Sequence, residues 1–163
     1  GGQIGVGKER KREAIASAKL LGVKKLIFLG FEVTNVPEGY ELIERVEKII
    51  HFYKIDRVYT HSLHDIHQDH RNTCRAVLAA GRKVRQILFF ESPSSDLDFR
   101  PTFFVDITNF IDKKMKTLSI YRSLLKMNKR YFEIEAIKSN AIFRGYQGNV
   151  KFAESFEVFR FLE

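Results

Sequence analysis

The stretch Tyr59-Thr-His-Ser-Leu-His-Asp-Ile-His-Gln-Asp-His-Arg71 decides how the rest of the chain is interpreted. It holds four of the five histidines of the chain, with Asp65 and Asp69 between them: His61, His64, His67 and His70. A β-branched and aromatic run, 55–60, precedes it, and a helix-like run follows it from Asn72. An open α/β sheet carries its functional groups where a strand passes into a helix. The stretch therefore predicts half of a metal-dependent hydrolytic site.

Length and composition describe one soluble globular domain. The 163 residues are 44% hydrophobic and 29% charged, enough for a single core over residues 1–163. No apolar run approaches the length of a membrane span, and no basic and apolar leader opens the sequence. The single cysteine, Cys74, excludes an internal disulfide framework and a cysteine-rich zinc site. We expect a reducing compartment, the cytoplasm.

The charge of the chain raises the question of a nucleic-acid partner. The formal net charge is +8 and the sequence pI is about 9.6. Much of the positive charge lies beside or within amphipathic helix patterns, at 8–12, 113–116 and 126–130, which is typical of a solvated helix face. No zinc-finger, RNA-recognition or basic-zipper pattern accompanies it. We therefore do not expect nucleic acid to be the partner, and the charge favours an anionic substrate or surface.

Apolar periodicity and turn residues predict alternating strands and helices. The predicted helices are 8–21, 40–53, 72–82, 108–125 and 132–144, and the predicted strands are 25–29, 57–60, 84–90, 102–107 and 155–162. The glycine-rich start, 1–7, is expected to be a flexible loop. Thr108 is a candidate cap, and Gly145 and Gly148 are expected to break the last helix. The alternation predicts an α/β protein: a three-layer, Rossmann-like open sheet, mostly parallel, with helices on both faces.

The histidine cluster has two interpretations. His67 and His70 are three residues apart, so both face one way if the chain turns into a helix there. Imidazole and carboxylate are zinc ligands, a catalytic zinc takes three protein ligands and a water, and a neighbouring carboxylate can fix an imidazole tautomer. Alternatively, the stretch is a polar turn whose aspartates cap a helix. Four histidines in ten residues favour the functional site, with further ligands from Asp65, His64 or neighbouring strand ends.

The string Asp65-Ile-His-Gln-Asp-His-Arg71 resembles the second signature of the PIG-L/LmbE-like zinc-dependent de-N-acetylases, usually written His-Pro-Asp-His. Gln68 stands where proline is commoner. Further stretches are similar to the family in order and spacing: Arg10-Lys-Arg-Glu13-Ala14 running to Leu21-Gly22-Val23, 28–31, 90–92, 104–107 with Lys113, and 153–156 with Arg160. The resemblance covers nearly the whole chain.

The resemblance implies a zinc site at the strand ends and hydrolysis of an acetamido group, commonly on an N-acetylglucosamine derivative. Carried over by position, His70 is a zinc ligand. His67 is the protonated imidazole that stabilises the oxyanion and protonates the leaving amine, and Asp69 orients or charge-supports His67. Arg10 is a candidate substrate-binding residue.

One family landmark is absent from the sequence. The first signature of the family, Ala-His-Pro-Asp-Asp-Glu, supplies two zinc ligands and the aspartate base, yet this chain has no His-Pro-Asp and no Asp-Asp pair. In the family it lies upstream of the Arg-x-x-Glu helix, whereas only residues 1–9 precede Arg10 here. The missing strand-helix-strand unit would take about 30 residues or more. We therefore expect that the domain is N-terminally truncated or that its N-terminal part is absent from this sequence. The remaining zinc ligands and the general base are expected before Gly1.

The main prediction is a zinc-dependent amide hydrolase acting on a small amino-sugar or glycoconjugate substrate. Two alternatives stay open: a catalytically incomplete relative acting as a binding or assembly module, and a basic nucleic-acid-binding domain with incidental histidines. The sequence leaves open the exact acetamido substrate and the formation of a homo-oligomer.

Overall fold

The computed structural model of the protein describes residues 2–127 and 133–163, with side chains from residue 7 onward. It divides into two compact units, residues 1–28 with 106–153 and residues 29–105 with 154–163. The single domain expected over 1–163 stays a prediction. Within the described residues, no helix is both long enough and apolar enough to cross a membrane.

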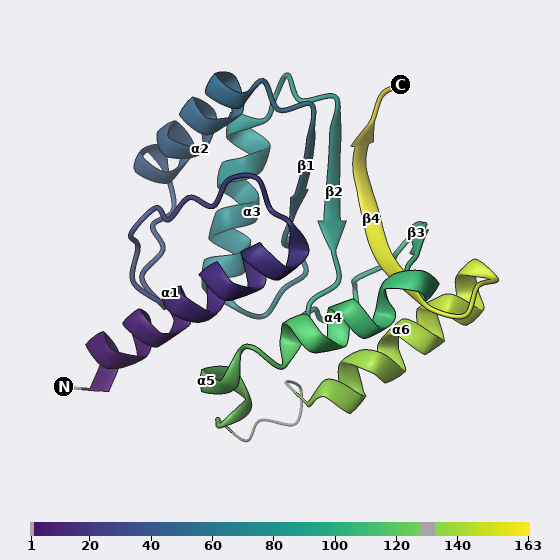
Figure 1. Ribbon diagram of the computed structural model, residues 1–163. Helices are drawn as coiled ribbons and strands as arrows, with labels where there is room; N and C mark the ends of the chain where they lie inside the picture. Colours follow the sequence, from purple (N-terminus) through teal and green to yellow (C-terminus); the bar gives the residue numbers. More distant parts are fainter. Residues whose placement is uncertain (1, 128–132) are drawn as a thin grey trace. The chain divides into compact units, whose positions relative to one another are not determined.

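The second unit is built on a four-stranded sheet with the order β1-β2-β4-β3 (Figure 1). β1 (Arg57–Thr60) runs parallel to β2 (Gln86–Phe90), with Val58 opposite Ile87. β4 (Ala153–Phe161) returns antiparallel to β2, and β3 (Phe103–Asp106) lies beyond it. The predicted α/β class with an open sheet is confirmed, and the sheet is mixed because the last strand of the chain inserts between β2 and β3.

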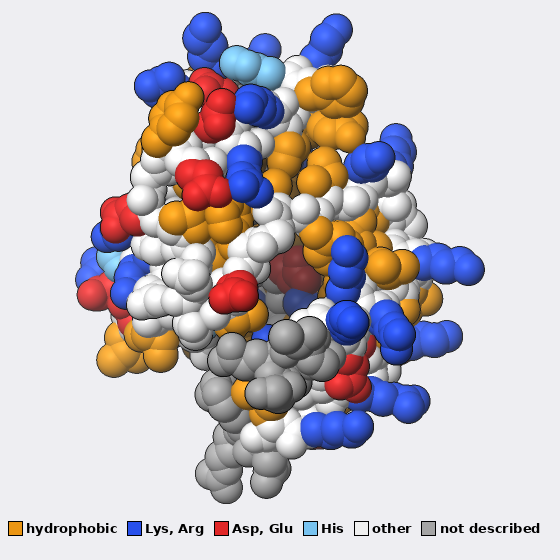
Figure 2. All heavy atoms as spheres, turned by 90° about the vertical axis from the view of Figure 1, so that its left-hand side faces the viewer, with side chains coloured by type: hydrophobic (Ala, Val, Ile, Leu, Met, Phe, Trp, Pro, Cys, Tyr) orange, Lys and Arg blue, Asp and Glu red, His pale blue; other side chains and the backbone are white. Residues whose placement is uncertain are grey.

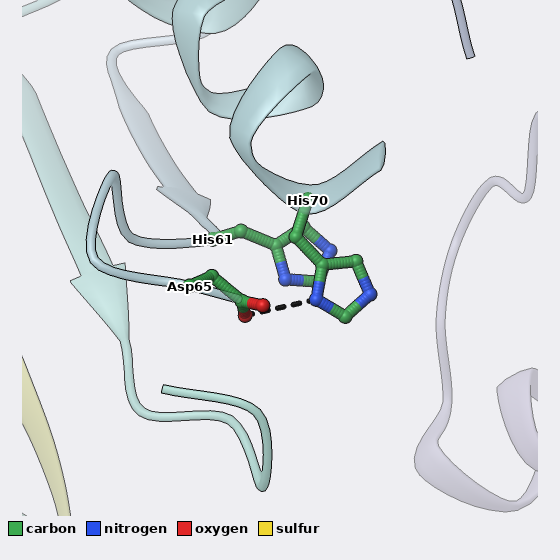
Figure 3. Close-up of side chains that lie close together, drawn as sticks. All are labelled: His61, Asp65 and His70. Atoms are coloured by element: carbon green, nitrogen blue, oxygen red, sulfur yellow. Dashed lines mark hydrogen bonds and ion pairs between the residues drawn. The ribbon is translucent and has the colours of Figure 1, made fainter. Parts of the chain in front are cut away.

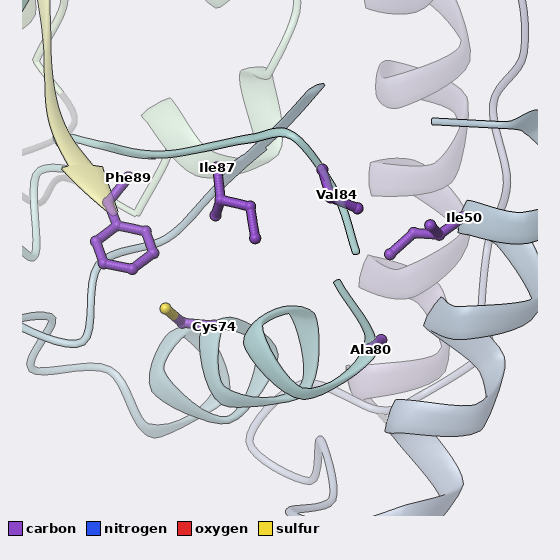
Figure 4. Packing of buried hydrophobic residues seen from close by; sticks show 6 residues of the cluster. All are labelled: Ile50, Cys74, Ala80, Val84, Ile87 and Phe89. Atoms are coloured by element: carbon purple, nitrogen blue, oxygen red, sulfur yellow. The ribbon is translucent and has the colours of Figure 1, made fainter. Parts of the chain in front are cut away.

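Two helices pack on this sheet. α2 (Tyr40–Tyr53) and α3 (Gln68–Ala80) lie against each other, and α3 contacts β1 (Figure 1). Their apolar faces meet the buried sides of the parallel strands in one core, made by Ile50, Cys74, Ala80, Val84, Ile87 and Phe89 (Figure 4). α2 has the bounds that its apolar stripe predicts. α3 begins four residues earlier than predicted because His67 caps it.

The first unit is helical. Its elements are α1 (Gly2–Leu21), η1 (Thr108–Phe110), α4 (Ile111–Leu118), α5 (Arg122–Leu125) and α6 (Ile134–Gly148). Gly22 ends α1 in the left-handed region, with φ of 78°, as expected for a glycine stop. The glycine-rich start was predicted to be a loop, and that prediction is wrong for residues 2–7, which continue α1 toward the N-terminus.

The predicted helix 108–125 is interrupted. Thr108 opens a short 3-10 turn instead of capping a long helix, and its Oγ1 accepts a hydrogen bond from Phe152 N. Tyr121 leaves helical geometry with ψ of 59°. Glu13 on α1 then accepts hydrogen bonds from Ser123 N at 2.8 Å and Ser123 Oγ at 2.5 Å, which satisfies an amide of the first turn of α5. The tertiary contact between Glu13 and Ser123 therefore defines the start of α5, and the local sequence around Ser123 gives no indication of this contact.

Two further elements differ from the prediction. Residues 25–29 form no strand, and Leu26, Ile27 and Phe28 are 40–45% exposed, because no described strand pairs with them. α6 continues through Gly145 to Gly148, because Gly145 lets the chain at 150–151 come close. An added Cβ there would lie 2.7 Å from the carbonyl oxygens of Val150 and Lys151. Phe132, the predicted start of this helix, lies outside the described residues.

Candidate functional site

The histidine stretch lies at the carboxyl ends of two neighbouring parallel strands. Residues 61–67 follow β1, residues 91–96 follow β2, and an isolated antiparallel bridge pairs Asp65 with Ser95. Ile66 N donates to Ser94 O at 2.9 Å, and Asp96 N donates to His64 O at 2.8 Å. Backbone bonds thus join the two loops, at the sheet edge where parallel strands present functional groups.

Asp65 is the buried acceptor at the centre of this region. Its side chain is fully enclosed, and Oδ1 accepts the backbone N–H of His67 at 2.8 Å. Oδ2 lies 2.6 Å from Ser92 Oγ, which donates to it, and 2.8 Å from His70 Nδ1. Burial opposes ionisation of the carboxyl, but the bonds from Ser92, His67 and His70 outweigh it and lower the pKa of Asp65 below its ordinary value. The carboxylate is therefore negative at neutral pH.

The imidazole of His70 lies between two other imidazoles. The ring of His61 is stacked on it with centroids 3.8 Å apart and planes 5° apart (Figure 3), and the ring of His67 lies on it at 4.6 Å and 22°. Burial and the neighbouring His70 lower the pKa of His61 to about 4, so His61 is neutral at pH 7. Ser94 Oγ is 3.2 Å from His70 Nδ1. Both faces and one edge of the His70 ring are thereby in contact with the protein.

The ring geometry decides which of these groups can share a metal ion. His61, Asp65 and His70 bring ligand atoms within 4.8 Å of one another. An imidazole binds a metal along the lone pair in its ring plane, and the nearly parallel planes of His61 and His70 do not meet at a common ion. Asp65 Oδ2 already accepts from Ser92 and faces His70 Nδ1. In this arrangement Nε2 of His70 is the ligand nitrogen that the cluster offers.

His67 begins α3. Its Nδ1 accepts the backbone N–H of Asp69 at 3.2 Å, which makes this imidazole the N-cap of the helix. The lone pair of Nδ1 is used in this bond, so the neutral ring carries its proton on Nε2. The ring is half-buried and lies on His70. The structure thus brings together the two histidines that were predicted to act together.

The carboxylate of Asp69 has partners in a different loop. Its side chain is buried, Oδ2 accepts Thr34 N at 2.6 Å, and Oδ1 accepts Val36 N at 3.3 Å. Gln68 Nε2 adds a bond to Thr34 O at 2.7 Å. The first turn of α3 therefore fastens residues 34–36. The predicted support of His67 by the Asp69 carboxylate stays a prediction, since the bond between the two residues runs through the Asp69 amide.

Arg10, the predicted substrate-binding residue, lies on α1 in the other compact unit. Its Nη2 is 3.4 Å from Met127 Sδ, and its Nε is buried with no hydrogen-bond partner among the described residues. Its predicted role stays a prediction. His64 is exposed and groups with the exposed carboxylates of Asp96 and Asp98.

Sequence reasoning did not identify Ser92 and Ser94 as members of the site. Ser92 Oγ bonds to Asp65, and its oxygen is 3.0 Å from Ser94 Oγ, which in turn reaches His70. The available signal was the position of Ser92 directly after a predicted strand, beside the strand that leads into the histidines. The partners of a hydroxyl cannot be predicted from that position alone.

A family model described as PIG-L, GlcNAc-PI de-N-acetylase, matches residues 2–81, which include the histidine stretch. The uncharacterized deacetylase YaiS of Escherichia coli (strain K12) is 32% identical over 122 residues. That alignment covers 71% of this chain and 66% of YaiS, so the chain spans about two thirds of that relative.

Solved structures share the fold. The conserved protein TT1542 from Thermus thermophilus superposes with a TM-score of 0.85 at 23% identity, over 99% of this chain and 78% of that one. N,N'-diacetylchitobiose deacetylase from Pyrococcus horikoshii gives 0.79 at 22% identity, over 94% and 64%. The resemblance seen in the histidine signature is confirmed. The chain belongs to the PIG-L de-N-acetylase family.

Proposed function

We propose that the protein is a zinc-dependent hydrolase that removes an acetyl group from an N-acetylglucosamine-type or related acetamido substrate. The observation that supports this most is the imidazole pair at the start of α3. His70 is turned by Asp65 so that Nε2 is its open nitrogen, and His67 lies against it with its proton on Nε2. One imidazole is thus suited to hold a metal ion and the other to move a proton.

The donor set at His70 fits zinc. A zinc-binding imidazole usually donates its other N–H to a carboxylate, and His70 Nδ1 lies 2.8 Å from the buried carboxylate of Asp65. His70 is the one ligand that we assign among the described residues, and a complete site needs further ligands around the same ion. A solved structure of this fold, 17% identical with a TM-score of 0.64, is the zinc-inhibited form of teicoplanin deacetylase Orf2. Because that form is zinc-inhibited, an activity assay on this protein should vary the zinc concentration and should not use zinc in excess.

When bound, zinc would supply a Lewis acid that polarises the acetamide carbonyl and makes water a stronger nucleophile. The residues of this chain would act around it. His70 would hold the ion through Nε2. His67 would give a proton to the amine nitrogen as the C–N bond breaks, so that water and the amide yield acetate and a free amine.

The proton-donor role places a condition on His67. An imidazolium carries a proton on both nitrogens, so Nδ1 can no longer accept the Asp69 amide when the ring is charged. Charging His67 therefore exchanges the cap bond for a bond from Nδ1–H to an acceptor. The Asp69 carboxylate, two residues along the chain, is the acceptor that the family resemblance assigns.

The experiment is a zinc titration with a deacetylation assay on the protein expressed from its complete gene. N-acetylglucosamine derivatives serve as substrates, and released acetate is measured. We expect activity that rises to one zinc per chain, and His67→Ala should retain zinc but turn over about 10²- to 10⁴-fold more slowly. Absence of zinc-dependent acetate release from every acetamido substrate, or an unchanged rate in His67→Ala, would contradict the proposal. His51→Ala is the matched control, because His51 is exposed and lies on α2.

A catalytically incomplete binding module is the alternative that the geometry favours next, because the parallel rings of His61 and His70 offer no common ligand position. Such a module would bind zinc weakly or not at all and release no acetate.

The nucleic-acid alternative has less support. Figure 2 shows acidic and hydrophobic side chains among the Lys and Arg side chains of this face. Salt-sensitive binding to generic DNA or RNA would revive it.

A further inference from the structure

The orientation of the His70 imidazole is restricted by contacts on its faces and at one edge. His61 and His67 lie on its two faces, and Asp65 and Ser94 meet its Nδ1 edge. Figure 3 shows two of these neighbours, His61 and Asp65. Stacking on both faces restricts the tilt of the ring plane. Bonds at one edge restrict rotation within that plane. Together they leave one direction for Nε2.

The group that makes the edge contact is itself held. The carboxylate of Asp65 accepts from Ser92 Oγ at 2.6 Å and from His67 N at 2.8 Å, so neither oxygen is free to turn. Its side chain has no exposed surface, and solvent therefore does not compete for it. Ser92 is in turn bonded within its own loop, because Ser94 N donates to Ser92 Oγ at 3.2 Å.

The chemistry of this contact selects a tautomer. Asp65 Oδ1 accepts the His67 N–H and Oδ2 accepts the Ser92 hydroxyl, so this carboxylate acts as an acceptor and His70 Nδ1 is the donor across the 2.8 Å contact. The proton of the neutral ring then lies on Nδ1, and the lone pair lies on Nε2. A histidine side chain in water has no contact that fixes its ring orientation or holds its proton on Nδ1.

We infer that Asp65 is a positioning residue that, anchored by Ser92, holds His70 as the Nδ1–H tautomer with Nε2 directed at the metal position. The metal part of this inference rests on the proposed role of His70 as zinc ligand. The tautomer part does not, because it describes the metal-free protein. His61 is the stacking partner that keeps the His70 ring in its plane.

The test combines a spectroscopic measurement with a binding measurement on the protein expressed from its complete gene. Long-range ¹H–¹⁵N NMR of the metal-free protein reports which nitrogen of each histidine carries the proton, and His70→Gln identifies the His70 signals. We expect the Nδ1–H tautomer in the wild type and its loss in Asp65→Asn. Zinc binding by Asp65→Asn should be about 10- to 100-fold weaker. Asp112→Asn, at an exposed carboxylate on α4, should change neither.

Two further outcomes keep the test decisive. If Asp65→Asn does not fold, Ser92→Ala removes one bond to the carboxylate without touching His70, and it should weaken zinc binding by about tenfold or less. An Nε2–H tautomer in the wild type, or unchanged zinc affinity in a folded Asp65→Asn, would overturn the inference. A wild type with the Nδ1–H tautomer that binds no zinc would refute the proposed function and leave the positioning of His70 supported.

Discussion

Replacing Asp69 by alanine should destabilise the protein through a loop distant in sequence. The buried carboxylate accepts the backbone N–H groups of Thr34 at 2.6 Å and of Val36 at 3.3 Å. A hydrogen bond to a charged acceptor contributes about 1.5–3 kcal/mol, and the longer bond belongs at the lower end or below. Asp69 also lies in the first turn of α3, where a negative charge adds about 0.3–1 kcal/mol.

The expected loss in the free energy of unfolding is therefore about 2–4 kcal/mol for Asp69→Ala. Urea unfolding followed by circular dichroism measures it, and limited proteolysis should show faster cleavage near residues 34–36. Asp98→Ala is the control, because Asp98 is exposed, and its stability should stay within about 0.5 kcal/mol of the wild type.

A change smaller than about 0.5 kcal/mol in Asp69→Ala would refute this reasoning. It would mean that the two amides find water or other acceptors at no cost. Lower activity at unchanged stability would instead assign Asp69 to the proton chemistry of His67 alone. The two roles of this carboxylate are thus separable by measuring stability and rate on the same variant.

Three further predictions concern other parts of the chain. Gly145→Ala should lower stability by about 1–3 kcal/mol despite the higher helix propensity of alanine, because its Cβ would lie 2.7 Å from two carbonyl oxygens; equal or higher stability would contradict this. Gly7→Ala, also helical but with nothing within 4 Å, should raise stability by up to about 1 kcal/mol in thermal unfolding. Burial raises the pKa of Cys74 to about 12, so an aromatic disulfide reagent at pH 8 should label this thiol only after unfolding. Since only the unfolded thiol loses its proton above pH 9, stability should also fall as pH rises above that value.

The sequence was most informative where a local pattern and the final packing agree. The apolar stripe of residues 40–53 predicted α2, and the run 57–60 predicted β1, with the bounds that the structure has. Both elements pack along one regular side against the core, so periodicity alone reports their environment. The histidine signature likewise lies between β1 and α3, where a parallel sheet carries its functional groups.

Tertiary contacts decided what the pattern could not. Glu13 starts α5 from another helix, and Gly145 lets a helix continue where glycine usually ends one. The run 25–29 has the composition of a strand but no described neighbour to complete its ladder. In the site, the sequence predicted His67 and His70, whereas the bond from Ser92 to Asp65 depends on two loops meeting.

The proposed function depends most on His70 as the residue that holds the metal ion. The direct measurement is zinc content by mass spectrometry, with zinc affinity by competitive titration, for His70→Ala and for His51→Ala in the protein expressed from its complete gene. We expect about one zinc per chain in the wild type and in His51→Ala, and loss of zinc in a folded His70→Ala. Full zinc occupancy in His70→Ala would contradict it.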